Sequence, residues 1–116
     1  MSIYTTVGCD IVKIARIKKL LKDKTIYEKI FHKSELARFE AQHLAGIFAG
    51  KESVFKALGI ASDRWLDIEI AAYTNGKPFI KLASALDDKN IISLDISISH
   101  EEDYAIAVVS VLRKKE

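Results

Sequence analysis

The sequence predicts an α+β fold in which N-terminal helices pack on an antiparallel β-sheet. Three observations lead to this prediction. Apolar residues follow helical spacing in most of the first half, they alternate as in strands in the second half, and an Asn-Gly pair supplies a turn between two of those strands. The chain has one proline and neither a flexible linker nor a repeat, so we expect a single domain over residues 1–116.

The first element expected is a strand from Ile3 to Val12 that runs directly into a helix. Apolar residues alternate in it with Gly8 and Asp10. From residue 11 onward the apolar spacing becomes helical, and basic side chains are displaced from the apolar face.

Two more helices are expected before the sheet resumes. Ser34 is a candidate N-cap for a short helix that continues to Glu40. The strongest helical pattern runs from about His43 to Leu58, and Gly59 provides its C-terminal stop. The large apolar residues of this helix fall along one line, which predicts a buried face.

The second half begins with a predicted hairpin. Residues 67–73 alternate polar and apolar, Asn75-Gly76 forms the turn, and residues 79–82 return. Pro78 confines the returning strand to an edge or shortens it, because proline has no N–H for the ladder.

Two further strands complete the sheet. The next strand has one apolar face, made of Ile92, Leu94, Ile96 and Ile98, opposite a polar face rich in serine. A polar loop at 100–103 leads to a nearly continuous apolar strand, Tyr104–Leu112. That last strand is apolar on both faces, so both need cover. Either the helices already provide it, or a homo-oligomer does.

The composition excludes several classes of protein. With 49% hydrophobic and 29% charged residues the chain is typical of globular proteins, and its net charge of +2 is too balanced for a dedicated nucleic-acid coat. One cysteine excludes a disulfide scaffold and a thiolate zinc cluster. No apolar run is long enough to span a bilayer, and no signal peptide is evident. We therefore expect a soluble cytoplasmic protein that binds neither membrane nor nucleic acid.

The basic residues are nevertheless concentrated in one segment. Residues 13–33 hold eight basic and two acidic side chains, a net charge of +6, so the rest of the chain is acidic. Such a segment is either a solvated helix face or a surface that steers an acidic partner. For charge runs in general a solvated face is the more common case, and the scarcity of acids at i,i+4 positions here adds weight to the partner.

Five polar residues break the local patterns. Asp10 ends an apolar strand and is either a site residue or the N-cap of the following helix. Lys51 lies among the core positions of its helix, where a charge needs a partner or a ligand. Glu52 is either a site residue or the i,i+4 partner of Lys56. His100, at a strand end beside serines, is either a surface residue or a hydrogen-bond donor to a phosphate.

Together these residues suggest phosphate chemistry. Two carboxylates completed by water describe a Mg²⁺ site, which substrate phosphates usually share. Nearby Lys and His side chains would offset the developing charge. The sequence lacks a P-loop motif and a dinucleotide-binding motif, so neither of those folds is supported. From spacing alone this remains a phosphate-handling hypothesis.

Four motifs make the sequence resemble the holo-[acyl-carrier-protein] synthases, the small type of 4′-phosphopantetheinyl transferase. The resemblance covers nearly the whole chain, and its motifs are Gly8-Cys9-Asp10-Ile11-Val12, residues 48–59 around Lys51-Glu52, Asn75-Gly76-Lys77-Pro78 and Ile96-Ser97-Ile98-Ser99-His100.

This resemblance implies Mg²⁺-dependent transfer of the 4′-phosphopantetheine arm from coenzyme A to a serine of apo acyl carrier protein. The reaction releases adenosine 3′,5′-bisphosphate and supports fatty acid biosynthesis. The family is typically a homotrimer with coenzyme A at the subunit interfaces, which would account for the two-sided apolar strand.

The resemblance also implies a role for each matching residue. Asp10 and Glu52 would bind the metal and, with Lys56, form the catalytic set, in which Glu52 could take the serine proton. Coenzyme A would be bound by Lys51, Lys56, Ser99 and His100. The acidic carrier would dock on Arg16, Lys19 and Lys22.

The sequence departs from the family pattern at several positions. Ile47 stands where many relatives have an arginine that helps hold the 3′-phosphate, and Arg38 and Lys33 are the candidate substitutes for it. Cys9 replaces an aliphatic residue and is expected on the buried side of its strand. Glu101 adds a negative charge beside His100, and the segment between Ser34 and Leu44 looks short.

Two alternatives to this function stay open from the sequence. One is a transferase of the same superfamily that serves a polyketide or peptide carrier. The other is a non-catalytic adaptor that binds an acidic protein through residues 13–33.

Overall fold

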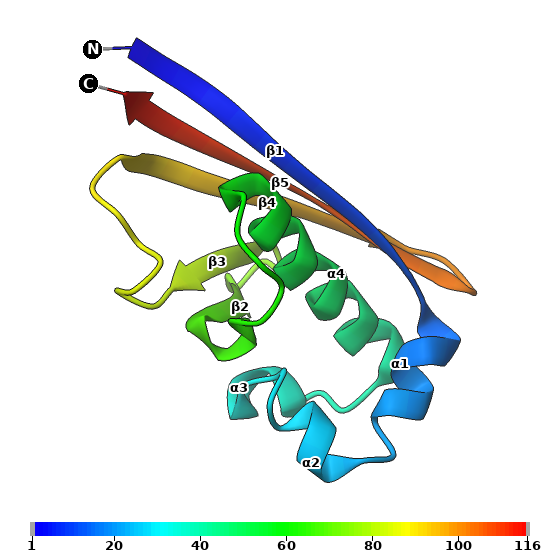
Figure 1. Ribbon diagram of the computed structural model, residues 1–116. Helices are drawn as coiled ribbons and strands as arrows, with labels where there is room; N and C mark the ends of the chain where they lie inside the picture. Colours follow the sequence, from blue (N-terminus) through cyan, green and yellow to red (C-terminus); the bar gives the residue numbers. More distant parts are fainter. Residues whose placement is uncertain (1, 116) are drawn as a thin grey trace.

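The computed structural model describes residues 2–115 and has the predicted α+β architecture. One long helix, α4, packs across a three-stranded antiparallel sheet, and a two-stranded hairpin packs beside that helix (Figure 1). The elements in chain order are β1 (Ser2–Lys13), α1 (Ile14–Leu20), α2 (Lys24–Tyr27), α3 (Lys33–Leu36), α4 (Ala41–Leu58), η1 (Trp65–Asp67), β2 (Ile68–Ala72), β3 (Pro78–Leu82), β4 (Ile91–His100) and β5 (Tyr104–Lys115).

The larger sheet has the order β1-β5-β4, so the first and last strands of the chain pair with each other. Their register runs from Ser2 opposite Lys115 to Lys13 opposite Tyr104. This pairing extends β1 to Lys13, and the Ile14 N–H then donates to the Asp103 carbonyl at 2.9 Å. The helix therefore begins at Ile14, and the predicted start at residue 11 is wrong because strand pairing outweighs the local helical spacing.

The long helix and the hairpin agree with the sequence. α4 ends at Gly59, whose φ of 70° is the left-handed conformation that terminates helices. The hairpin pairs Ile70 with Ile80, and Pro78 is the first residue of β3, where a ladder N–H is not needed.

The short helix α3 differs from its prediction. It spans Lys33–Leu36 with His32 as its N-cap, so Ser34 is not the cap. The His32 N–H donates to the Glu35 carboxylate at 2.7 Å, and the Ser34 hydroxyl instead donates to Glu69 at 2.6 Å. A contact with β2 has thus replaced the local capping bond.

The helices and the hairpin lie on one side of the larger sheet (Figure 1). The core forms there, between α4 and the inward residues of β1, β5 and β4. The opposite face of the sheet is apolar but uncovered in this chain, with Ile11 62% exposed and Val7 60% exposed. The alternative in which the chain's own helices cover both faces of β5 is therefore not what the structure shows.

Two predicted side-chain orientations are wrong. Cys9 is exposed on this outer face, since Gly8, Asp10 and Val12 are the β1 residues that face α4. Ile92 is exposed as well, because the β4–β5 register shifts between Ile91 and Ser93 and turns it outward, whereas Leu94, Ile96 and Ile98 face the core as expected.

No helix within residues 2–115 is both long and apolar enough to cross a membrane.

Candidate functional site

The site is built where β1 crosses α4. Gly8 is buried at this crossing, and a Cβ there would clash with the Ser53 carbonyl and lie 2.8 Å from the Ala57 N. The Ser53 hydroxyl donates to the Ala107 carbonyl of β5 at 3.1 Å, which also ties the helix to the sheet. Strand and helix therefore touch backbone to backbone, and only glycine permits this approach.

This approach brings Asp10 to Lys56. The Lys56 ammonium donates to the Asp10 carboxylate at 3.2 Å and to the Cys9 carbonyl at 2.9 Å. The Asp10 side chain is mostly buried, whereas the Lys56 side chain is 53% exposed. Asp10 does not cap α1, whose N-cap is Lys13, so the helix-cap alternative is wrong.

Glu52 lies on α4 one turn before Lys56, on the same side of the helix. Its carboxylate accepts a hydrogen bond from the Ser62 hydroxyl at 3.1 Å. In the described part of the chain Lys56 pairs with Asp10 and not with Glu52, so the predicted i,i+4 alternative is not observed. The structure thus pairs Asp10 with Lys56 at the β1–α4 crossing and places Glu52 one helical turn before Lys56.

Lys51 is placed differently from its prediction. Its side chain is fully buried, and the ammonium donates to the Glu35 carboxylate and the Ile30 carbonyl at 2.7 Å each and to the Trp65 carbonyl at 3.2 Å. Burial lowers the Lys51 pKa, while the Glu35 charge acts in the opposite direction. An ammonium whose three donors are engaged inside the protein cannot also bind a phosphate. The predicted coenzyme A contact of Lys51 is therefore corrected to a buried ion pair.

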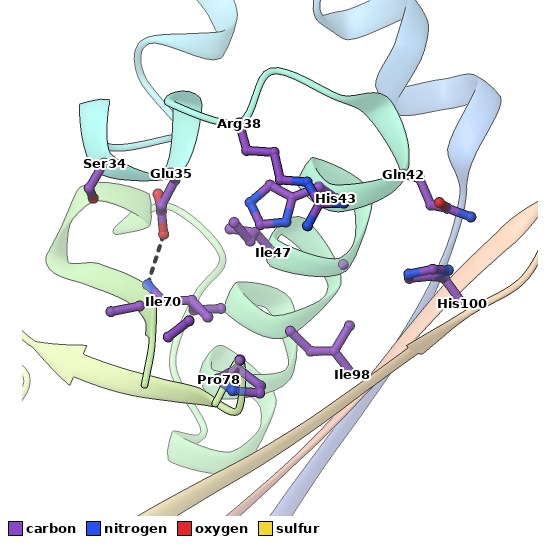
Figure 2. A pocket seen from close by; sticks show the side chains of 14 residues that line it. Ser34, Glu35, Arg38, Gln42, His43, Ile47, Ile70, Pro78, Ile98 and His100 are labelled. Atoms are coloured by element: carbon purple, nitrogen blue, oxygen red, sulfur yellow. Dashed lines mark hydrogen bonds between the residues drawn. The ribbon is translucent and has the colours of Figure 1, made fainter. Parts of the chain in front are cut away.

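Glu35, the partner of Lys51, was not found from the sequence. It also accepts from the Ile70 N–H at 2.8 Å (Figure 2). With the Lys51 bond, one carboxylate therefore joins α3, α4 and β2. A glutamate in a four-residue helix has no local signal of burial, so only the placement of α3 against α4 could have identified it.

His100 and Ser99 lie on opposite faces of β4. His100 lines a cavity of about 500 Å³ on the helix side of the sheet (Figure 2). Ser99 pairs with Ile106 on the exposed outer face and does not line this cavity. Within one chain, the structure therefore does not bring Ser99 and His100 together.

Besides Glu35, the cavity is lined by Gln42 and His43, which sequence reasoning left out, and by Arg38, which it raised as a substitute cation. Lys33, the other suggested substitute, is exposed outside the cavity lining. Ile47 forms part of the buried wall. The spacing of His43 and Ile47, one helical turn apart, was the signal that could have located His43.

The three predicted docking residues lie on or just after α1. Arg16, Lys19 and Lys22 are all exposed. The Arg16 guanidinium lies 5.2 Å from the ring centroid of Phe48, so the charged end of this side chain lies over α4. The exposure of these residues fits a docking surface and leaves that role a prediction.

Comparison with known proteins defines the class of the fold. A family model described as the 4′-phosphopantetheinyl transferase superfamily matches residues 6–109. The holo-[acyl-carrier-protein] synthase of Alkaliphilus metalliredigens is 41% identical over 113 residues, which cover 87% of this chain and 93% of that protein. The corresponding synthase of Caldanaerobacter subterraneus is 40% identical over 114 residues, which cover 88% and 90%.

Solved structures lead to the same family. The Helicobacter pylori holo-[acyl-carrier-protein] synthase in complex with coenzyme A matches with a TM-score of 0.84 and 40% identity, over 90% of this chain and 98% of that one. A Bacillus anthracis synthase in complex with CoA (3′,5′-ADP) matches with a TM-score of 0.81 and 28% identity, over 97% and 100%. The chain belongs to the holo-[acyl-carrier-protein] synthase family. The predicted enzyme class, 4′-phosphopantetheinyl transferase, is thereby confirmed, and the adaptor alternative is set aside.

Proposed function

We propose that the protein transfers the 4′-phosphopantetheine arm of coenzyme A to a serine hydroxyl of an apo acyl carrier protein. The observation that carries this proposal is the contact between Asp10 of β1 and Lys56 of α4, one helical turn after Glu52, in a chain of this family. Relatives of the same fold have been solved with coenzyme A, which supports the choice of donor.

The reaction is a phosphoryl-type transfer. The serine oxygen forms a bond to the phosphorus that carries the pantetheine, and the bond from that phosphorus to the adenosine phosphate oxygen breaks. Adenosine 3′,5′-bisphosphate leaves, and the serine proton passes to a base, for which Glu52 is the candidate directly or through water. Positioning and charge neutralisation supply most of the acceleration in such reactions.

Asp10 and Glu52 would hold Mg²⁺. The donor set fits this ion, because two carboxylates completed by waters and substrate phosphates suit a hard cation, and the Lys56 ammonium 3.2 Å from Asp10 shows that this carboxylate already attracts a positive charge. In residues 2–115 no group of three or more His, Cys, Asp or Glu forms a protein-only metal cage, so waters and phosphates would supply the other ligands. When bound, the ion neutralises charge on the pyrophosphate.

Lys56 is placed to hold a phosphate oxygen. Two of its three donors are engaged with Cys9 and Asp10 in the described chain, which leaves one for the substrate. Its exposure lets a ligand reach it, and its contact with Asp10 fixes its direction. His100, which lines the cavity on the helix side of the sheet, would bind a second phosphate group of coenzyme A.

We also propose a homotrimer in which each chain contributes one domain and coenzyme A binds at the subunit interfaces. The uncovered apolar face of β1 and β5 supports association, since monomers rarely expose large contiguous apolar patches. Ser99 lies on that outer face, so it can contribute to coenzyme A binding only in a site that a neighbouring subunit completes. Sedimentation equilibrium of the protein and of Ile11→Asp would test this assembly.

The carrier is proposed to be the acyl carrier protein of fatty acid synthesis, in the cytoplasm. A polyketide or peptide carrier is the alternative, and both would present acidic helices to the basic segment. Rates with the two kinds of apo carrier would separate them.

Mass spectrometry tests the transfer itself. Apo carrier protein incubated with coenzyme A, Mg²⁺ and the enzyme should gain the mass of phosphopantetheine, and Asp10→Ala or Glu52→Ala should abolish this gain. Asp87→Ala, which removes an exposed carboxylate elsewhere, should retain activity. Full activity in both site variants would show that the metal assignment is wrong.

A further inference from the structure

The segment between α4 and η1, residues 60–64, runs back alongside the long helix (Figure 1). Two hydrogen bonds at the end of α4 set this direction. The Gly59 N–H donates to the Lys56 carbonyl at 3.3 Å. The Ile60 N–H donates to the Phe55 carbonyl at 3.0 Å. These are the two bonds of a Schellman motif, which turns the chain back after a helix. Ile60 then packs against the core, so the start of the segment is fixed.

The other end of the segment is fixed at Trp65. Its ring stacks on Phe48 with the ring centroids 4.9 Å apart, and it meets the Phe55 ring edge-on at 5.1 Å. The Trp65 carbonyl accepts one of the three hydrogen bonds of the buried Lys51 ammonium, at 3.2 Å. Residues 60–64 are therefore held against α4 at both ends, and a connection this short stays close to the helix.

Ser62 lies in the middle of this segment and reaches the Glu52 side chain. Its hydroxyl donates to Glu52 Oε2 at 3.1 Å. Ser62 is exposed, and Glu52 is partly buried. No ion pair among residues 2–115 engages Glu52. A carboxylate has two oxygens, so the bond from Ser62 holds one and leaves the other available to a ligand.

This contact differs in charge from the contact at Asp10. Asp10 pairs with the Lys56 ammonium, which offsets its negative charge. Ser62 is a neutral donor, so it can fix the direction of the Glu52 carboxylate while the carboxylate keeps its charge. A hard divalent cation requires charged oxygen ligands in a defined arrangement. Carboxylates that bind metals are accordingly hydrogen-bonded to neighbouring groups in most sites.

We propose that Ser62 is a positioning residue, whose hydroxyl holds the Glu52 carboxylate in the direction needed to bind the divalent cation. The proposal rests on the proposed function, because it takes Glu52 as a metal ligand. In this role Ser62 acts through Glu52 and touches neither the cation nor the reacting atoms. Residues 60–64 then belong to the site, although none of them was among the site residues predicted from the sequence.

Binding of Mn²⁺, a paramagnetic substitute for Mg²⁺, tests the proposal without turnover. The EPR signal of free Mn²⁺ is measured with the protein and coenzyme A, against coenzyme A without protein. Ser62→Ala should raise the Kd for Mn²⁺ about tenfold, as loss of a residue that orients a metal ligand does. Ser62→Thr keeps the hydroxyl and should bind like the wild type. Ser84→Ala, which removes an exposed serine in the turn after β3, is the matched control and should leave the Kd unchanged.

The outcomes separate this inference from the function on which it rests. A Kd in Ser62→Ala equal to that of the wild type would overturn the role of Ser62. Asp10→Ala should lose the Mn²⁺ site altogether. Mn²⁺ binding that is unchanged in Asp10→Ala, or absent from the wild type, would refute the metal assignment itself and this inference with it.

Kinetics with apo carrier protein give a second readout. In Ser62→Ala the Mg²⁺ concentration for half-maximal rate should rise about tenfold. KM for coenzyme A and for the carrier, at saturating Mg²⁺, should stay at the wild-type values. The urea midpoint without metal should not change, because the lost bond lies at the surface. A higher KM for the carrier at an unchanged Mg²⁺ requirement would show that Ser62 contacts the carrier, and would overturn the proposal.

Discussion

Two lysines on α4 each form an ion pair, but the two pairs differ in burial. Lys51 and Lys56 each pair with a carboxylate that lies far away in the sequence, Glu35 and Asp10. The first pair is fully buried and its ammonium is saturated by three protein oxygens. The second ammonium is half exposed and has two protein partners. Burial and the number of free donors, and not the ion pair itself, separate a structural lysine from one that can bind substrate.

The two pairs also differ in what their loss would do. A buried ion pair adds little net stability when intact, but removal of one partner strands a charge in the interior. The Asp10–Lys56 pair is only partly buried, so loss of Lys56 should cost less than loss of Lys51, because water reaches the pair from the Lys56 side. Lys51 should therefore affect folding and Lys56 the reaction.

The largest effect is expected for Lys51→Met. Loss of the ammonium leaves the Glu35 carboxylate buried with only backbone N–H donors, so the free energy of unfolding should fall by about 3–5 kcal/mol. Urea denaturation measures this change. The double variant Lys51→Met with Glu35→Gln should recover part of the loss, because the stranded charge is gone. If Lys51→Met lost activity at unchanged stability, Lys51 would act on substrate, as the sequence had suggested.

Lys56→Ala should show the reverse pattern. Removal of a donor aimed at the substrate phosphate should lower kcat by about 10²–10³-fold. The free energy of unfolding should fall by clearly less than in Lys51→Met, because this pair is only partly buried. Lys89→Ala, at an exposed lysine, serves as the control and should alter neither quantity. A large loss of stability in Lys56→Ala would erase the distinction between the two lysines.

Reversal of charge on α1 should have a smaller, purely kinetic effect. The variant Arg16→Glu with Lys19→Glu should raise KM for the carrier roughly tenfold, because exposed charges guide and orient an acidic partner. The wild-type KM should also rise with salt, and that dependence should weaken in the variant. Coenzyme A affinity, measured alongside, should be unchanged. An equal loss of both affinities would mean that the basic helix has been misread.

The smallest effect is expected for Ser34→Ala, which removes an exposed contact beside the buried Glu35 site. The Ser34 hydroxyl bond is the main cause that lowers the Glu69 pKa below its ordinary value of 4.5. A lowered carboxyl pKa stabilises the fold above the unfolded pKa, and that contribution is lost as the pH falls through the lower folded pKa. The free energy of unfolding of the variant should therefore be lower than that of the wild type by at most about 1 kcal/mol at pH 7, and equal to it in strong acid. Urea denaturation at the two pH values measures this difference.

The elements with a local signal were predictable from the sequence. Gly59 marked the end of α4, and Asn75-Gly76 marked the hairpin, because each signal lies in the residues that form the turn. The orientation of Cys9 was not predictable, since alternation shows that two faces exist but not which one the helix covers. The role of Lys51 needed the position of Glu35, sixteen residues away on another helix.

The candidate site was predicted in part. The motif resemblance named Asp10, Glu52 and Lys56; the structure pairs Asp10 with Lys56, and the role of all three stays a prediction. The resemblance named Lys51 and Ser99 as well. The Lys51 ammonium, however, has all its donors engaged by buried protein oxygens, and Ser99 lies on the outer face of the sheet. His43 was missed because a histidine in the first turn of a helix has no sequence signal of its own that distinguishes it, and only the structure shows that it lines a cavity.

The contact at Gly8 has a consequence for how the site tolerates change. β1 and α4 meet at Gly8 through their backbones. The spacing between β1, which holds Asp10, and α4, which holds Glu52, therefore does not depend on the sizes of side chains at this contact. Substitutions among the core side chains can then alter the stability of the protein while the distance between β1 and α4 at the proposed site stays the same.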